Sequence, residues 1–140
     1  NAGLTSIIIP KSVKTIGTYA FQRCGHLSSV SFEKNSQLET VDTAAFEYCN
    51  LTSIKIPKSV KMIEFLAFCD NTNLAVVDLT EFTDESIEKI PNINDSKSFD
   101  GCSESLKFYV ANKNMKSIFT SVSGWSRYAN KFTTDPVPTI

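Results

Sequence analysis

Apolar side chains recur along the chain with a period of about 23 residues. The segment that begins at Leu4, LTSIIIPKSVK, returns as LTSIKIPKSVK from Leu51. Segments with the same apolar pattern also begin at Leu27 and Leu74. Within each segment the last apolar pair, such as Ile7 and Ile9, is two residues apart, which is typical of a strand that buries one face. The pattern predicts one short strand per unit.

A second apolar array repeats in phase with the first. Its triplets keep spacings of three and five residues, and they are Val13, Ile16 and Phe21; Leu38, Val41 and Phe46; Val60, Ile63 and Phe68. We assign the fourth triplet to Ile87, Ile90 and Phe99, with the second interval stretched to nine residues. The phenylalanines of the four triplets are expected to form a buried aromatic column.

A period of 20–29 residues with one strand per coil is characteristic of leucine-rich repeats. A single coil cannot bury its apolar face, whereas stacked coils bury it against one another. The predicted fold is an α/β repeat solenoid, a right-handed superhelix of short parallel strands with a C-terminal helical cap. Residues 1–111 form the array of about four to five coils, and its fourth unit (74–105) is long.

Residues 112–132 are predicted to close the array as a cap. A short helix is expected over 112–121, with Asn112 or Asn114 at its N-cap. Its apolar residues lie at helical spacing, and Trp125, Tyr128 and Phe132 follow it. Residues 133–140, with two prolines, are expected to be a flexible tail.

The repeated pattern Leu-Thr-Ser-Ile-x-Ile-Pro-Lys-Ser-Val-Lys, followed by Ala-Phe-x-x-Cys, resembles the BspA-type leucine-rich repeats over residues 4–110. The segment from Leu106 to Ala129 is similar to the closing unit of such arrays. The resemblance implies a secreted or cell-surface protein, associated in that family with adhesion to host proteins and matrix. It supplies no catalytic residues.

Three departures from a regular array lead to further expectations. The fourth unit is about eight residues longer than the others, so it is expected to bulge. The last strand is followed by Ala111 where other units have proline, and it is expected to be an edge strand. The first coil begins at Leu4 without a cap, which suggests that more repeats precede it and that an exposed apolar end favours end-to-end association.

The composition narrows the choice of partners. The formal net charge is −1, from 14 basic and 15 acidic residues. This balance gives no electrostatic reason to expect nucleic acid as a partner. No apolar run approaches the length that spans a bilayer, so direct membrane insertion is not expected.

The four cysteines do not form a metal-binding pattern. Cys24, Cys49 and Cys102 each stand three residues after a column phenylalanine, and Asn71 fills that place in the third unit. Leucine-rich repeats use Asn or Cys there. Because Cys-x-x-Cys is absent, zinc is not expected. We expect buried free thiols, with a disulfide as the alternative; Cys69 lies outside the repeat pattern.

Other candidate chemistry is sparse. His26, the single histidine, could pair with Cys24 as base and nucleophile, but its position between two coils favours an ordinary loop residue. The long unit holds Glu81, Asp84, Glu85, Glu88 and Asp95, and a solvated acidic loop is favoured over a calcium site. The sequence predicts no enzyme, no cofactor and no metal.

Strand alternation places ten side chains on the outer face of the strand ribbon. They are Ser6, Ile8, Ser29, Ser31, Ser53, Lys55, Val76, Asp78, Lys107 and Tyr109. We predict that a protein or glycan ligand binds this face, with Tyr109 as the main anchor because tyrosine is enriched at binding hot spots. The alternative is a non-binding spacer or stalk within a larger surface protein.

Overall fold

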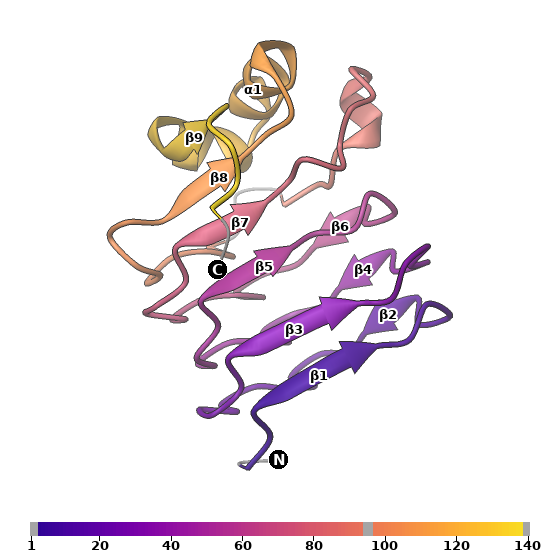
Figure 1. The fold of residues 1–140 in the computed structure, drawn as a ribbon, viewed down its shortest axis with the longest axis vertical. Coiled ribbons are helices and arrows are strands. Elements are labelled where there is room, and N and C mark those ends of the chain that lie inside the picture. The colour runs from indigo at the N-terminus through magenta and orange to yellow at the C-terminus, as the bar shows by residue number, and fades with distance from the viewer. Residues whose placement is uncertain (1–2, 94–96, 139–140) are drawn as a thin grey trace.

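The computed structural model describes residues 3–93 and 97–138, and these form a stack of coils with a helical unit at one end (Figure 1). Each coil carries one strand at the front of the stack, and the first three coils carry a second, shorter strand at the back. All of the strand pairs are parallel. The predicted repeat solenoid is therefore confirmed.

The front strands are β1 (Ser6–Ile9), β3 (Ser29–Phe32), β5 (Ser53–Lys55), β7 (Val76–Asp78) and β8 (Lys107–Tyr109). Their alternation follows the sequence: in β3, Ser29 and Ser31 are exposed and Val30 is buried. In β1, Ile9 is buried and Ile7 is partly buried, so both face inward as expected.

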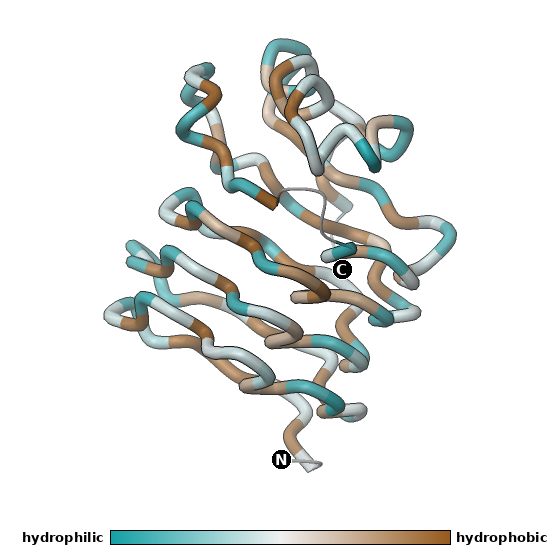
Figure 2. Tube along the Cα trace, turned by 180° about the vertical axis from the view of Figure 1, so that it is seen from behind, coloured by the Kyte–Doolittle hydropathy of each residue, from teal (hydrophilic) through white to brown (hydrophobic). Residues whose placement is uncertain are grey.

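The back sheet consists of β2 (Thr15–Ile16), β4 (Thr40–Val41) and β6 (Met62–Ile63), in that order. It continues without interruption across the first three coils, and apolar and polar residues alternate along its coils in Figure 2. The middle residues of the first three triplets, Ile16, Val41 and Ile63, thus lie on the back strands and are buried.

The predicted aromatic column is present, and its four phenylalanines lie in turns of consecutive coils. The rings of Phe21, Phe46, Phe68 and Phe99 stack with centroid separations of 5.2, 5.5 and 5.2 Å, and their planes are nearly parallel. Three of the four are fully buried, while Phe21 in the first coil is partly exposed. The column runs through the stack from the first coil to the cap.

The turns beside this column contain non-glycine residues with positive φ at two repeating positions. Ala44 and Leu66 stand at the first, and Tyr48 and Asp70 at the second. Such conformations are unfavourable for residues with a Cβ. Backbone hydrogen bonds between consecutive coils run alongside them, for example from the N–H of Tyr48 to the carbonyl of Cys69 at 3.0 Å. The ladder of coil-to-coil bonds offsets the cost of this backbone shape.

The assignment of the fourth triplet is confirmed at Phe99, which stacks on Phe68, and is wrong at Ile87 and Ile90. Ile87 lies in a 3-10 helix, η1 (Ile87–Lys89), and is 60% exposed. Asn92 instead bridges Met62 of β6, and Ile93 is fully buried. The inserted residues therefore precede Ile90 and form a surface excursion, and the inward array resumes only after it. Asp95 lies outside the described residues.

The cap begins with α1 (Lys113–Ser121), whose N-cap Asn112 accepts a hydrogen bond from the Met115 N–H at 2.9 Å. Met115 and Phe119 are fully buried on its inner face. Next comes the 3-10 segment η2 (Trp125–Lys131). Trp125 is completely buried and its indole donates to the Pro91 carbonyl at 2.7 Å, which ties the cap to the long fourth coil.

The last strand of the front sheet is β9 (Phe132–Thr133), which pairs with β8. The expectation that β8 is an edge strand is therefore wrong, since β7 and β9 flank it. Thr133, placed by the sequence analysis at the start of the tail, pairs with Tyr109. A cap that returns to the sheet supplies the neighbour that a further repeat would otherwise provide.

Candidate partner-binding face

The ten predicted binding residues lie on the front strands, and most of them reach solvent. Ser6, Ser29, Ser31, Lys55 and Lys107 are exposed, and Ile8 is 67% exposed. Ser53, Val76 and Asp78 are partly exposed. We call the outer surface of β1, β3, β5, β7 and β8 the front face.

Tyr109 does not belong to this exposed set. It is 8% exposed, against the expectation that it would be the main anchor. The strand β9 lies beside it, and in Figure 1 the chain beyond β9 passes in front of β8. Alternation alone predicted an outward side chain, whereas the returning cap covers this end of the face.

The carboxylate of Asp78 also accepts hydrogen bonds from a residue close to it in the sequence. Its Oδ1 accepts hydrogen bonds from the backbone N–H of Thr80 at 2.9 Å and from the Thr80 hydroxyl at 2.6 Å. This arrangement turns the chain at the end of β7. Asp78 therefore serves the start of the long loop as well as facing outward.

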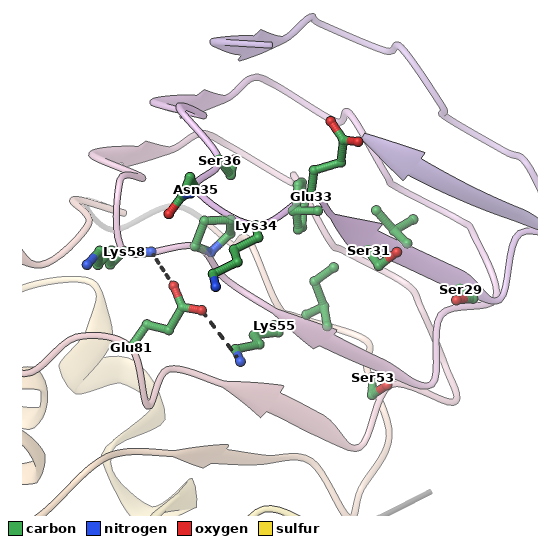
Figure 3. A pocket seen from close by; sticks show the side chains of 14 residues that line it. Ser29, Ser31, Glu33, Lys34, Asn35, Ser36, Ser53, Lys55, Lys58 and Glu81 are labelled. Atoms are coloured by element: carbon green, nitrogen blue, oxygen red, sulfur yellow. Dashed lines mark hydrogen bonds and ion pairs between the residues drawn. The ribbon is translucent and has the colours of Figure 1, made fainter. Parts of the chain in front are cut away.

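The front strands do not form one continuous ladder. Among the described residues, β1 pairs with β3, and a separate sheet contains β5, β7, β8 and β9 in that order. Between β3 and β5 lies a groove of about 720 Å³, which we call the β3/β5 groove (Figure 3). Ser29, Ser31, Ser53 and Lys55 line it, so the groove brings together four of the ten predicted residues.

The same two coils remain joined elsewhere. At the back, Thr40 and Val41 of β4 pair with Met62 and Ile63 of β6. The N–H of Asn50 also donates to the Leu27 carbonyl at 3.0 Å, near the start of the front strands. The opening is thus confined to the front of the junction between the second and third coils, which we call the second junction.

Two features of the sequence account for the opening. Between the first two coils, the N–H of Glu33 donates to the Ile9 carbonyl at 3.0 Å, whereas the corresponding residue of the third coil is Pro57. Proline has no N–H to donate. In addition, eleven residues separate Leu27 from Leu38, whereas nine separate the corresponding residues of the first and third coils. The extra residues lengthen the loop that borders the groove.

Several groove residues were missed by the sequence analysis. They come from this loop and from the neighbouring coils, and they are Glu33, Lys34, Asn35, Ser36, Pro57, Lys58 and Glu81. The longer Leu27–Leu38 interval was the signal that could have found the loop residues. The distance between the starts of consecutive units, 23 or 24 residues, hides this longer interval. The second coil compensates for part of it, because its segment from Phe46 to Leu51 is one residue shorter than the equivalent segments.

The charges at the groove are distributed unevenly. Glu81 forms an ion pair with Lys55 at 3.5 Å and accepts the backbone N–H of Lys58 at 3.1 Å. Glu33 accepts the backbone N–H of Lys11 at 2.8 Å. In the part of the chain that the structure describes, no ion pair engages the ammonium groups of Lys34 and Lys58. Figure 3 shows these lysines at the end of the groove where β3 and β5 terminate.

The residues that stand three positions after the column phenylalanines hydrogen-bond consecutive coils to each other at their turns. Asn71 donates to the Phe46 and Phe68 carbonyls at 2.9 Å each and accepts the Leu51 N–H at 3.1 Å. Cys49 donates to the Phe21 carbonyl at 3.0 Å, in the same manner. All four cysteines are free thiols, and Cys102 is less buried than the others. Burial raises the pKa of Cys49 to about 11 and that of Cys102 to about 12.

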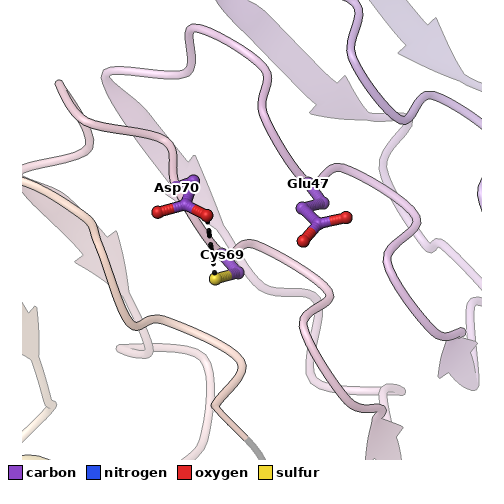
Figure 4. Close-up of side chains that lie close together, drawn as sticks. All are labelled: Glu47, Cys69 and Asp70. Carbon is purple, nitrogen blue, oxygen red and sulfur yellow. Dashed lines mark hydrogen bonds between the residues drawn. The ribbon is translucent and has the colours of Figure 1, made fainter.

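The thiol sulfur of Cys69 and carboxylate oxygens of Glu47 and Asp70 lie within 4.8 Å of one another (Figure 4). Among the described residues this is the one group of three side chains close enough together to hold a metal ion. Burial and the neighbouring Asp70 raise the pKa of the Cys69 thiol to about 12. The thiol donates to Asp70 at 3.5 Å, and Gln22 donates to Glu47 at 2.6 Å. These hydrogen bonds tie the three side chains into the turns of neighbouring coils.

The carboxylates of the long loop act separately. Glu81 serves the groove, Asp84 accepts the Ser86 N–H at 2.9 Å, and Glu85 accepts from Asn114 of the cap at 3.2 Å. The backbone hydrogen bond from Ser86 lowers the pKa of Asp84. His26 is exposed in the turn before the second coil. In the described part of the loop the carboxylates do not converge on one point.

Stacked coils, a parallel front sheet and an open outer face define a solenoid of the leucine-rich repeat class. The sequence model of the BspA type leucine rich repeat region matches residues 1–122 in six copies. The chain belongs to this family, whose repeats are in general non-enzymatic modules that mediate protein interactions. None of the described helices is long and apolar enough to cross a membrane.

Two solved structures are similar to this chain. The pneumococcal vaccine antigen PcpA has 24% identity and a TM-score of 0.55, over 79% of this chain and 31% of that one. A leucine-rich repeat protein from Bacteroides ovatus has 22% identity and a TM-score of 0.44, over 76% of this chain and 31% of that one. The chain thus spans about a third of either structure, and no curated protein matches it.

Proposed function

We propose that this chain is a non-catalytic binding module of a secreted or cell-surface protein and that it binds a protein or glycan partner through its front face. The observation that carries the proposal is the β3/β5 groove, because four residues predicted from strand alternation line one cavity. A volume of about 720 Å³ lies within the range of pockets that hold ligands.

The chemistry of the front face suits a macromolecular partner. Its side chains are mainly small and polar, and Ile8 is the large apolar group that stands well out of the surface. Repeat proteins use such extended faces for binding. The covered Tyr109 shifts the expected contact region from the cap toward the first three coils.

Membership of the family supports the proposed extracellular location and the adhesive role by analogy. A non-binding spacer is the second candidate. The coil-to-coil hydrogen bonds and the aromatic column favour it, because they make a stiff rod without requiring a ligand.

Binding of the chain to arrays of extracellular matrix proteins and glycans tests the proposal. The variant Ser29→Arg/Ser53→Arg fills the entrance of the groove, and the matched control Ser28→Arg/Thr52→Arg places the same charges at exposed neighbouring positions. We expect saturable binding that the first variant loses and the control keeps. Absence of binding by a folded chain would favour the spacer.

A further inference from the structure

The turns beside the aromatic column carry a row of equivalent polar side chains. The residue that follows each column phenylalanine is polar in all four coils, and the four residues are Gln22, Glu47, Cys69 and Asp100. At the cap end of the row, Asp100 forms an ion pair with Arg127 at 2.8 Å. In the middle of the row, Glu47 and Cys69 lie beside Asp70, and these three side chains form the cluster of Figure 4.

We propose that Glu47, Cys69 and Asp70 bind a zinc ion that links the turns of the second and third coils. A thiolate combined with carboxylate oxygens suits zinc, whereas Ca²⁺ and Mg²⁺ take oxygen ligands. The absence of Cys-x-x-Cys concealed this set, because its three ligands come from two coils. None of them lines the β3/β5 groove, so the inference is independent of the proposed binding function.

The separations between the ligand atoms fit a tetrahedral ion. With Zn–S of about 2.3 Å and Zn–O of about 2.1 Å, a sulfur and an oxygen on one zinc ion lie about 3.6 Å apart. The Cys69 sulfur and Oδ2 of Asp70 are 3.5 Å apart. Since all three ligand atoms lie within 4.8 Å of one another, a rotation of the Glu47 side chain completes the set. Asp70 is partly exposed, so water can reach the fourth position.

Burial distinguishes the cluster from a group of surface carboxylates. Glu47 is 9% exposed and Cys69 is 7% exposed. In the described chain, neither Glu47 nor Asp70 forms an ion pair. The guanidinium of Arg23 stacks on the Tyr48 ring at 4.7 Å. Because a buried carboxylate is costly without a compensating charge, a divalent cation between the three side chains supplies what the chain itself does not.

The backbone directs the ligands toward one another. Successive side chains of an extended segment point to opposite sides. Asp70 instead has a φ of 61°, and its carboxylate turns back to the thiol of the residue before it. In the next coil a Cβ at Gly101 would collide with this carboxylate, so the glycine leaves room for it. Gln22 donates to Oε1 of Glu47 at 2.6 Å and orients it, as residues that hydrogen-bond metal ligands do.

Zinc binding converts the thiol into a ligand. The Cys69 thiol donates to Asp70 in this structure, whereas zinc binds the thiolate, so the thiol proton passes to solvent as the Zn–S bond forms. The Asp70 oxygen that accepted this proton is then free to coordinate. The ion replaces one sulfur hydrogen bond within a turn by bonds that connect two coils, and it should therefore stabilise the array.

Cobalt(II) is the spectroscopic probe for this site, because it adopts the geometry of zinc and its thiolate complexes absorb in the near ultraviolet. Titration of the metal-free, reduced chain with Co²⁺ should produce such a band, and Zn²⁺ should abolish it. Zn²⁺ at about a hundredfold excess over its Kd should raise Tm by about 5 °C or more. Mg²⁺ at the same concentration should leave Tm unchanged. Absence of both the band and the shift in Tm would overturn the inference.

Substitution of the ligands locates the ion. Cys69→Ser should abolish the cobalt band, whereas Cys24→Ser, at a buried cysteine of the first coil, should keep it. Glu47→Gln and Asp70→Asn retain the thiol and should each weaken zinc binding at least about tenfold. The matched control Glu39→Gln makes the same change at an exposed carboxylate of the second coil and should leave the affinity unchanged.

The variants also distinguish this cluster from the other thiols. A cobalt band that survives Cys69→Ser, or that Cys102→Ser removes, would place the metal elsewhere and overturn the inference. If Cys69→Ser does not fold, Glu47→Gln and Asp70→Asn decide, since zinc binding unaffected by both changes would also overturn it. A band lost with the Cys69 thiol, together with an affinity lowered by both carboxylate variants, would establish a zinc link between two coils.

Discussion

The junction between the first two coils and the junction between the second and third are built from the same repeat, yet only the first is closed at the front. Four residue pairs join β1 to β3, whereas β3 and β5 share none in the described chain. At the back, both junctions have the same two-residue pairing. The contrast shows that one proline and a longer loop can open one side of a repeat without separating the coils.

The largest expected effect comes from the element that both junctions share. Phe46 is fully buried and stacks on Phe21 and Phe68, so Phe46→Ala should destabilise the chain by about 3–5 kcal/mol. Urea denaturation measures the loss. Phe65→Ala, at a residue that is 49% exposed, should change stability by about 0.5 kcal/mol or less. Equal losses for the two variants would argue against the column as the main support.

The next effect concerns the turn side of the second junction. Asn71→Ala leaves the Leu51 N–H and the Phe46 carbonyl without their Asn71 partner, removes one of two donors from the Phe68 carbonyl, and should cost about 1–3 kcal/mol. Asn71→Cys should cost less, because Cys49 makes a similar bond to a carbonyl. Asn73→Ala, at an exposed neighbouring asparagine, is the control. Thermal unfolding of the three variants checks this order.

A smaller effect should follow from restoring a donor at the front. Pro57→Thr introduces an N–H opposite the Phe32 carbonyl, and we expect that amide to exchange about tenfold more slowly than an unprotected one. The net change in stability should stay within about 1 kcal/mol, because the new bond and the loss of proline rigidity offset each other. Exchange at the unprotected rate would show that the longer loop alone keeps the junction open.

The smallest expected effect concerns the capped end of the array and not its two junctions. Hydrogen bonds from Arg127 and Tyr128 lower the pKa of Asp100. A carboxyl with a lowered native pKa stabilises the fold above its unfolded pKa, and this contribution is lost as pH falls through the native value. The cap should therefore loosen in acid before the array does.

Fluorescence of Trp125 measured from about pH 5 to pH 2 follows this loosening. Asp100→Asn should reduce the change in the signal over that range. Asp84→Asn removes another carboxyl with a lowered pKa, but one that caps a turn in the long loop, and it should leave the signal unchanged. If Asp100→Asn gave the same pH profile as the native chain, Asp100 would not be the group whose protonation loosens the cap.

How far local pattern predicts this protein depends on the region. The period, the inward residues of the strands and the aromatic column were predicted, and the N-cap was narrowed to Asn112 or Asn114, because each depends on contacts between equivalent residues or on a few neighbours in sequence. The fourth triplet was misplaced because Ile87, inside the insertion, precedes Ile90 by the same three residues that separate Ile90 from Ile93 in the buried array. Position within a loop cannot be distinguished from position on a strand by spacing alone.

The sequence by itself determined that this chain is a repeat solenoid and which side chains alternate outward from its strands. Repetition made that possible, since the same local pattern recurs in register and each coil has the same neighbours. Only the tertiary structure decided that Tyr109 is covered, that β8 has a second neighbour and that β3 and β5 part to form a groove. Those features depend on how the cap folds back and on whether backbone groups of two coils meet, and no single coil encodes either.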